Sequence, residues 1–273
     1  MLQNRVIVTS KKDKDEIYKS SKNKWIIELD GNEIISWYDF YDIIQKEIDI
    51  VDYHSKFGRK YHTFADFSGD IELFNEVQKR KVDGIIIILN YTENFKKVLT
   101  KEKENIYYCI ILKMLLEWYR DLKIIYNQEK PTINIEMYIL LEEEMKEFTN
   151  EFIIAIEDDR KEIYKEYGDY KIVELKVEFE LNEYLSEILK KEIKNDSLIY
   201  EILREDENEK FINEFNKKLD NNYSKLKLLL SNSDKLRDYH DYILFYIIEN
   251  ILIQKYERDE EIKIYMIFSN EIC

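Results

Sequence analysis

Two of the three histidines, His54 and His62, lie in a stretch that also carries Asp52 and Asp66. Imidazole and carboxylate groups together can ligate zinc or transfer protons as acid and base. The spacing of these four residues matches no helix face and no recurrent ligand motif, and a histidine in such a stretch is more often packed or solvated. The sequence therefore predicts no metal site and no catalytic site here.

The other residue types that catalysis needs are also poorly placed. Cys109 stands among apolar residues, where a buried and inert thiol is expected, and Cys273 is far from it in sequence. The five glycines are too widely spaced for a dinucleotide fingerprint or a phosphate loop, since the two nearest, Gly58 and Gly69, are eleven residues apart. We expect a protein that is not an enzyme and that holds no cofactor.

Charge restricts the class of partner. The formal net charge is -15, from 42 basic and 57 acidic residues. Residues 1–140 contribute -1 and residues 141–273 contribute -14, so the acidity belongs to the second half. Such a chain repels nucleic acid and anionic membrane and suits a basic partner. We expect no direct nucleic-acid binding, no membrane segment and, with only two cysteines, a cytoplasmic location.

Apolar patterns along the chain predict an α/β fold. Residues 25–29 are typical of a strand, residues 30–32 of a turn, and Ser36 of the N-cap of a helix over residues 37–48. The unbroken run of isoleucine and leucine at 85–89 indicates a strand buried on both faces, as in a parallel sheet. Further strands are expected at 133–139, 172–179, 226–230 and 262–268.

The two halves show the same order of elements, which predicts two tandem α/β domains. We expect a first domain over residues 1–141, a connecting helix over 142–167 and a second α/β domain over 168–273. A diverged duplication is one interpretation, and chance agreement between two unrelated domains is the other. Under duplication, strands 85–89 and 226–230 are each central in a separate sheet, flanked by strands of their own half.

Several elements of the first half, taken in order, resemble the barstar family of intracellular ribonuclease inhibitors. They are the segment 25–34 (Trp-Ile-Ile-Glu-Leu-Asp-Gly-Asn-Glu-Ile), the helix with the aromatic residues of 37–41, the segment from Phe57 and Gly58 to Asp66, and the strand at 85–89. The similarity covers residues 22–141. It implies a small parallel sheet with helices packed around it, which agrees with the apolar pattern.

The resemblance also implies where a partner binds. In barstar-like proteins, acidic and aromatic side chains after the aromatic-glycine signature plug the enzyme's positively charged phosphate site. Phe57 and Gly58 match the signature and Asp66 the central acidic position, whereas His62 stands where an acidic residue is common and Ala65 where a large aromatic is common. The corresponding segment of the second half is acidic, and we expect a partner surface or a solvated helix face there. Its residues are Glu201, Glu205, Asp206, Glu207 and Glu209.

Together these features predict an intracellular inhibitor, an immunity protein or antitoxin, that blocks a basic protein toxin by covering its active site. A nuclease is the expected toxin, and complementary charge would speed its capture. The alternative is a non-catalytic protein-interaction or regulatory module on a barstar-like scaffold. The sequence leaves the oligomeric state open.

Overall fold

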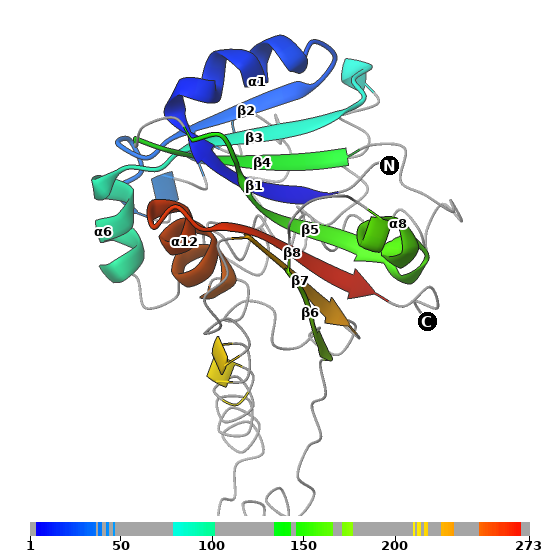
Figure 1. The fold of residues 1–273 in the computed structure, drawn as a ribbon. Helices are drawn as coiled ribbons and strands as arrows, with labels where there is room; N and C mark the ends of the chain where they lie inside the picture. Colours follow the sequence, from blue (N-terminus) through cyan, green and yellow to red (C-terminus); the bar gives the residue numbers. More distant parts are fainter. Residues whose placement is uncertain are drawn as a thin grey trace, which may run out of the picture.

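The described strands of the protein lie side by side in one sheet (Figure 1). The structure is a computed structural model, and it describes residues 4–36, 79–101, 134–142, 146–165, 171–176, 225–231 and 246–268, with a few single positions between them. The described strands form an eight-stranded sheet in the order β2-β3-β4-β1-β5-β8-β7-β6. Their bounds are β1 Arg5–Ser10, β2 Trp25–Asp30, β3 Gly84–Asn90, β4 Asn134–Leu141, β5 Asn150–Ile156, β6 Lys171–Lys176, β7 Lys225–Ser231 and β8 Glu261–Phe268.

Neighbouring strands are parallel everywhere except at the centre of the sheet. β2, β3, β4 and β1 run parallel to one another, and so do β5, β8, β7 and β6. β1 and β5 pair antiparallel, and we call this pair the seam. Each half therefore has its first strand at the seam and its second strand at an outer edge, and the strand order of the two halves is the same.

The described helices repeat in the same way after the first strand of each half. The 3₁₀ turn η1 (Lys11–Asp13) and helix α1 (Lys14–Ser20) follow β1, and η2 (Glu157–Asp159) and α8 (Arg160–Lys165) follow β5. Beyond these, α6 (Glu93–Lys101) follows β3, while a π-helical segment η4 (Ile247–Ile253) continues as α12 (Gln254–Glu257) and leads into β8. No helix in the described ranges is long and apolar enough to cross a membrane.

A shift of 146 residues aligns the start of the first half, from its first to its second strand, with the start of the second half. Residues 4–30 and 150–176 align without a gap, and ten of the 27 positions are identical. The densest match joins residues 13–19, Asp-Lys-Asp-Glu-Ile-Tyr-Lys, to residues 159–165, Asp-Arg-Lys-Glu-Ile-Tyr-Lys. The starts of η1 and η2, of α1 and α8, and of β2 and β6 all obey this shift.

The seam is symmetric about one residue pair. Val6 pairs with Phe152, and Phe152 is the residue that corresponds to Val6 under the 146-residue shift. A pseudo-twofold axis therefore passes through this pair, perpendicular to the sheet, and the halves meet as the subunits of an isologous dimer do. The two flanking pairs are Arg5 with Ile153 and Ile7 with Glu151. The shift converts one of these pairs into the other, because Arg5 corresponds to Glu151 and Ile7 to Ile153.

Apolar side chains cover both faces of the sheet, and α1 and α8 lie on the same face. All seven residues of β3 are buried, which confirms the strand expected there. Strand register places the residues beneath the two helices on one face, which we call the α1/α8 face. Ile17 of α1 packs on Ile86, Ile88 and Leu140, and Ile163 of α8 packs on Ile153, Leu229 and Tyr265.

Two expectations about domain organisation are wrong. The segment 142–167 is not a connecting helix, because it contains strand β5 and only a short helix, α8. The strands of the second half do not form a separate sheet, because the seam joins them to those of the first half. Charged, helix-prone residues dominate this segment, and the apolar run of β5 is stabilised by pairing with distant strands.

Candidate functional site

All the residues predicted to bind a partner lie outside the described residues, but the described strands fix their place in the topology. The segment 57–66 belongs to the connection between β2 and β3, and the segment 201–209 to the connection between β6 and β7. β2 and β6 are the two outer strands, so both segments lie in the equivalent connection of their half. The residues concerned are Phe57, Gly58, His62, Asp66, Glu201, Glu205, Asp206, Glu207 and Glu209.

The β2–β3 connection starts from a tight turn that is tied to β3. Gly31 N donates a hydrogen bond to the carbonyl oxygen of Asn90 (3.1 Å), and Asn32 N donates to Oδ1 of Asp30 (2.9 Å). A Cβ atom at residue 31 would lie 2.3 Å from the Asn90 carbonyl oxygen, so this close approach requires glycine. The turn expected from the Asp-Gly-Asn sequence is therefore confirmed, and it gives the connection a rigid origin.

A helix begins a few residues later, where the sequence predicts its N-cap. Asp39 N donates to the Ser36 carbonyl oxygen (3.2 Å), and Oδ2 of Asp39 accepts from the backbone N and the Oγ of Ser36 (both 2.8 Å). These reciprocal contacts form a capping arrangement. Ile34 beside it is fully buried, whereas Ile35 is 75% exposed. The start of the connection is thus anchored by one isoleucine and offers another to solvent.

Glu28 is the centre of a polar cluster at the outer edge of the first half. Its carboxylate accepts hydrogen bonds from Lys14 Nζ, from the Tyr18 hydroxyl (2.6 Å) and from Asn90 Nδ2 (3.1 Å). Partial burial opposes ionisation, but these donors outweigh it and hold the pKa of Glu28 below its usual value. Burial and the bond to Glu28 raise the pKa of Tyr18 to about 12. Neither group changes protonation near neutral pH, so the cluster clamps α1 to the edge strand.

The side-chain amide of Asn90 has one buried oxygen, Oδ1, that accepts no hydrogen bond from the described residues. Because Nδ2 faces the Glu28 carboxylate, the amide orientation is set, and Oδ1 accepts no hydrogen bond within the described structure. Asn90 is 8% exposed. A single buried carbonyl of this kind is commonly satisfied by one ordered water, so it defines no ligand site by itself.

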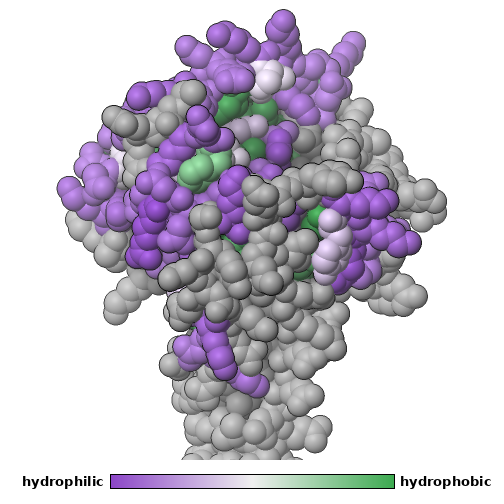
Figure 2. Space-filling model, viewed as in Figure 1, coloured by the Kyte–Doolittle hydropathy of each residue, from purple (hydrophilic) through white to green (hydrophobic). Residues whose placement is uncertain are grey.

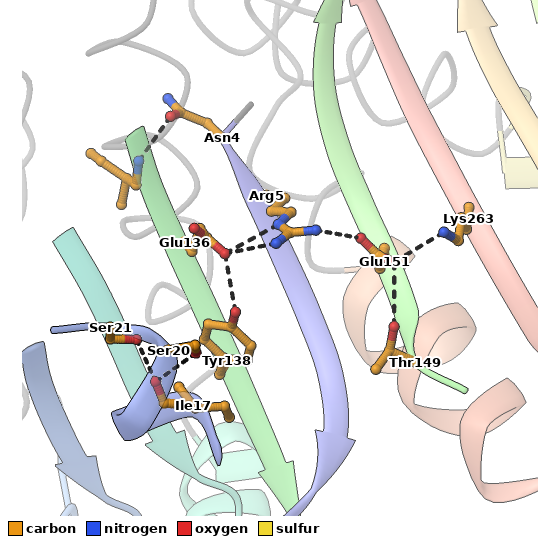
Figure 3. Close-up of polar contacts among 11 residues, drawn as sticks. Asn4, Arg5, Ile17, Ser20, Ser21, Glu136, Tyr138, Thr149, Glu151 and Lys263 are labelled. Carbon is orange, nitrogen blue, oxygen red and sulfur yellow. Dashed lines mark hydrogen bonds and ion pairs between the residues drawn. The ribbon is translucent and has the colours of Figure 1, made fainter. Parts of the chain in front are cut away.

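A second polar cluster crosses the seam on the α1/α8 face (Figure 3). Arg5 in β1 pairs with Glu136 in β4 (2.9 Å) and with Glu151 in β5 (3.1 Å). Glu151 pairs in turn with Lys263 in β8 (3.2 Å). Four strands thus carry charges that alternate in sign, and we call this set the seam ladder. The Tyr138 hydroxyl also donates to Glu136 (3.0 Å).

Electrostatics keep Arg5 of the seam ladder charged and the neighbouring Tyr138 neutral. Desolvation lowers the pKa of Arg5, but attraction to Glu136 and Glu151 outweighs it, so the pKa lies above its usual value. Burial and the neighbouring Glu136 raise the pKa of Tyr138. A guanidinium and a phenol held in these states neither give up nor accept protons at neutral pH. The ladder is therefore suited to holding the two halves together, and it shows no arrangement for acid-base catalysis.

The halves also meet beyond the ends of the strands. The Tyr91 hydroxyl, directly after β3, donates to Oε2 of Glu249 in η4 (2.9 Å). Burial and the charge of Glu249 raise the pKa of Tyr91, which keeps the phenol protonated. Tyr91 also stacks edge-to-face on Phe95 of α6, with ring centroids 5.9 Å apart. This contact ties the β3–α6 region to the helix that precedes β8.

The described residues contain no group of three or more histidine, cysteine, aspartate or glutamate side chains that could hold a metal ion. The seam ladder and the Glu28 cluster were not predicted from the sequence. The signal that could have found the seam is the 146-residue repeat, in which Asn4 and Asn150 are equivalent. Each accepts a hydrogen bond on Oδ1 from the backbone N of an equivalent strand residue, Ile135 (3.0 Å) and Ile262 (2.8 Å).

Comparisons of the chain with models of protein families, with curated proteins and with solved structures find no match. The resemblance to barstar therefore rests on the residues quoted for it.

Proposed function

We propose that this protein is a non-catalytic inhibitor that blocks a basic protein toxin, with a nuclease as the toxin class, through the connections that follow its two edge strands. We also infer that the chain is a diverged duplication, with a barstar-like half and a second half of the same topology. Under this proposal the β2–β3 and β6–β7 connections are equivalent binding regions whose charges have diverged.

The observation that carries this proposal is the shared place of the two segments. The segment 57–66, which carries the barstar-like signature, and the acidic segment 201–209 both lie between the second and third strand of their half. The second half carries -14 of the net charge of -15. An acidic surface in this position would steer a basic partner toward the protein and speed its capture.

The described structure supplies a suitable support for such regions. The turn at Gly31 and the cap at Ser36 and Asp39 fix the chain where the first connection leaves β2. The strands beneath are paired in one eight-stranded sheet, and most of their apolar side chains in the described ranges are buried. Connections that leave a rigid sheet are common places for binding residues.

The direct test uses the protein encoded by the gene next to this one, purified and mixed with the full chain. Isothermal titration calorimetry measures binding, and cleavage of a fluorescent RNA or DNA substrate measures inhibition. We expect tight binding and loss of nuclease activity at equimolar ratio. Binding without inhibition of any activity would favour the alternative, an interaction or regulatory module. If no neighbouring product binds, the inhibitor proposal is refuted for that genome context.

Two sets of variants then locate the binding surface. We expect that neutralising Glu205, Asp206, Glu207 and Glu209 together weakens toxin capture more than Asp66→Ala does. A matched control neutralises four exposed carboxylates elsewhere, Glu93, Glu147, Glu257 and Asp259, and changes the net charge equally. A large loss for Asp66→Ala alone, with little effect of either quadruple change, would place the binding surface on the first half.

A further inference from the structure

Basic residues gather at one end of the sheet although the chain as a whole is strongly acidic. Two segments, residues 19–24 and 79–83, contain six basic residues and one acidic residue, a net charge of +5, whereas the whole chain carries -15. Five of the six basic residues are exposed, and Lys24 is half-buried. We call these six residues the basic patch: Lys19, Lys22, Lys24, Lys79, Arg80 and Lys81.

The fold brings the two segments together, although they are about 60 residues apart in sequence. Asp83 N donates a hydrogen bond to the Asn23 carbonyl oxygen (2.9 Å), and the side chains of these two residues are also hydrogen-bonded to each other. The Arg80 guanidinium lies over the Trp25 ring, 4.1 Å from its centroid. In Figure 1 the chain enters β3 beside the turn that joins α1 to β2. These contacts hold the basic patch in place before any partner binds.

Lys81 occupies a backbone conformation that favours glycine. Its φ is 57°, and it directly follows helical residues, a position where glycine is the most common residue. Backbone strain of this kind is common at functional sites. The sequence thus keeps an exposed cation at a position where glycine would fit the backbone better.

The chemistry of the basic patch fits phosphate groups better than a protein surface. No large apolar side chain within residues 19–24 and 79–83 is exposed, whereas protein interfaces have an apolar core. Five of the six cations are lysines, which bind phosphate as point charges. Figure 2 shows mostly hydrophilic residues over α1 and the end of the sheet beside it. Several cations on one surface match a chain of linked phosphates.

We propose that the basic patch binds the phosphate backbone of a nucleic acid strand, irrespective of its base sequence. The expectation that nucleic acid is excluded follows from the total charge, but charges farther than about 8 Å are screened at physiological ionic strength. The local charge of +5 therefore decides what approaches this end of the sheet. The dissociation constant lies in the range of non-specific binding, about 10–100 μM. This inference does not depend on the proposed toxin.

The first test measures the fluorescence anisotropy of labelled single strands of RNA and of DNA, about 12 nucleotides long, titrated with the purified full chain. We expect equal binding of both strands, because both carry the same phosphates. A plot of the logarithm of the binding constant against the logarithm of the salt concentration should have a slope of about -2 to -3, which corresponds to about three or four phosphate contacts.

Three results of this titration would overturn the proposal. The first is no binding of either strand at about 1 mM protein and about 0.05 M salt. The second is a preference above about tenfold for RNA or for DNA, which would require contacts to groups other than phosphate. The third is tighter binding of a labelled oligoglutamate of the same charge, which would assign the basic patch to an acidic protein partner.

Neutralised variants test the surface itself. Lys22→Gln/Lys81→Gln removes one exposed cation from each segment, so it should weaken binding at least about fivefold and make the salt slope shallower by about 1.4. The matched control Lys96→Gln/Lys97→Gln makes the same change in net charge on exposed residues of α6 and should weaken binding by less than about twofold. Equal effects of the two variants would show that the basic patch is not the binding surface.

Lys81→Gly separates a binding role of this residue from a structural one. Glycine removes the cation and suits a φ of 57°, so binding should weaken about twofold to threefold while the urea midpoint of unfolding stays unchanged or rises. A lower midpoint together with unchanged nucleic acid binding would mean that Lys81 supports the fold, and it would overturn the role of Lys81 in binding.

Discussion

Glu151→Gln is the change that best tests whether the seam ladder stabilises the sheet. The side chain of Glu151 is 9% exposed and pairs with Arg5 at 3.1 Å and with Lys263 at 3.2 Å. Glutamine keeps the shape of the side chain and removes the charge. Arg5 keeps its pair with Glu136, whereas Lys263 loses the partner seen here.

The magnitude follows from distance and exposure. Two unit charges about 3 Å apart attract by roughly 5 kcal/mol at an effective dielectric constant of about 20. Desolvation and side-chain ordering cancel most of this, and Arg5 and Lys263 are 37% and 24% exposed, so solvent screens both pairs. We expect about 1 kcal/mol from each pair, hence a loss of about 2 kcal/mol in the free energy of unfolding and about 4–8 °C in Tm.

The assay is equilibrium unfolding in urea, because guanidinium chloride would screen the ion pairs under study. The control is Glu157→Gln, an exposed carboxylate that pairs with Arg160 within one turn, and it should change stability by less than about 0.5 kcal/mol. Exchanging only Arg5 and Glu151 should be worse than Glu151→Gln, since Glu136 and Lys263 would then face like charges. If Glu151→Gln matches the control, or if the exchange is tolerated, the ladder does not act as one unit.

Three further changes have defined outcomes. Gly31→Ala should lower the free energy of unfolding by about 1–3 kcal/mol, measured by urea unfolding, because the new Cβ would lie 2.3 Å from the Asn90 carbonyl oxygen; an unchanged midpoint would contradict the close approach. Asn150→Ala should cost about 3 kcal/mol, since the fully buried amide bonds Ile262 N, Leu252 O and Glu260 O, and the same assay on Asn4→Ala should show a loss of the same sign. The pKa of Tyr18 is raised above its unfolded value, so the contribution of Tyr18 to stability should be complete below pH 10 and lost as the pH rises through about 12. The check is an absorbance titration at 295 nm, taken as the difference between wild type and Tyr18→Phe. A midpoint near pH 10 would refute this prediction.

Local patterns in the sequence predicted most of the strands and the first turn. The run at 85–89 is apolar at every position, which suits a strand with both faces covered, and β3 is buried throughout. The Asp-Gly-Asn turn and the cap at Ser36 also depend on neighbours within a few residues. Such features are readable because their contacts are short in sequence. The same patterns predicted β4, β6, β7 and β8 within a few residues of their observed bounds.

Features that depend on distant residues were not predicted. β1 has a short apolar core, Val6 to Val8, and its place in the sheet comes from pairing with β4 and β5, more than 120 residues away. The seam ladder joins Arg5, Glu136, Glu151 and Lys263, which share no local spacing. The predicted partner residues in 57–66 and 201–209 lie outside the described residues, so that part of the proposal stays a prediction.

The sequence by itself determined that apolar strands would alternate with helices, that the first connection would start at a glycine turn, and that the second half would carry the negative charge. Only the tertiary structure decided that the halves share one sheet. The physical reason is that backbone hydrogen bonds at a strand edge are alike for every strand, so local patterning cannot name the neighbour. Side chains that meet across the edge make that choice, and at this seam they are Val6 on Phe152 and the alternating charges beside them.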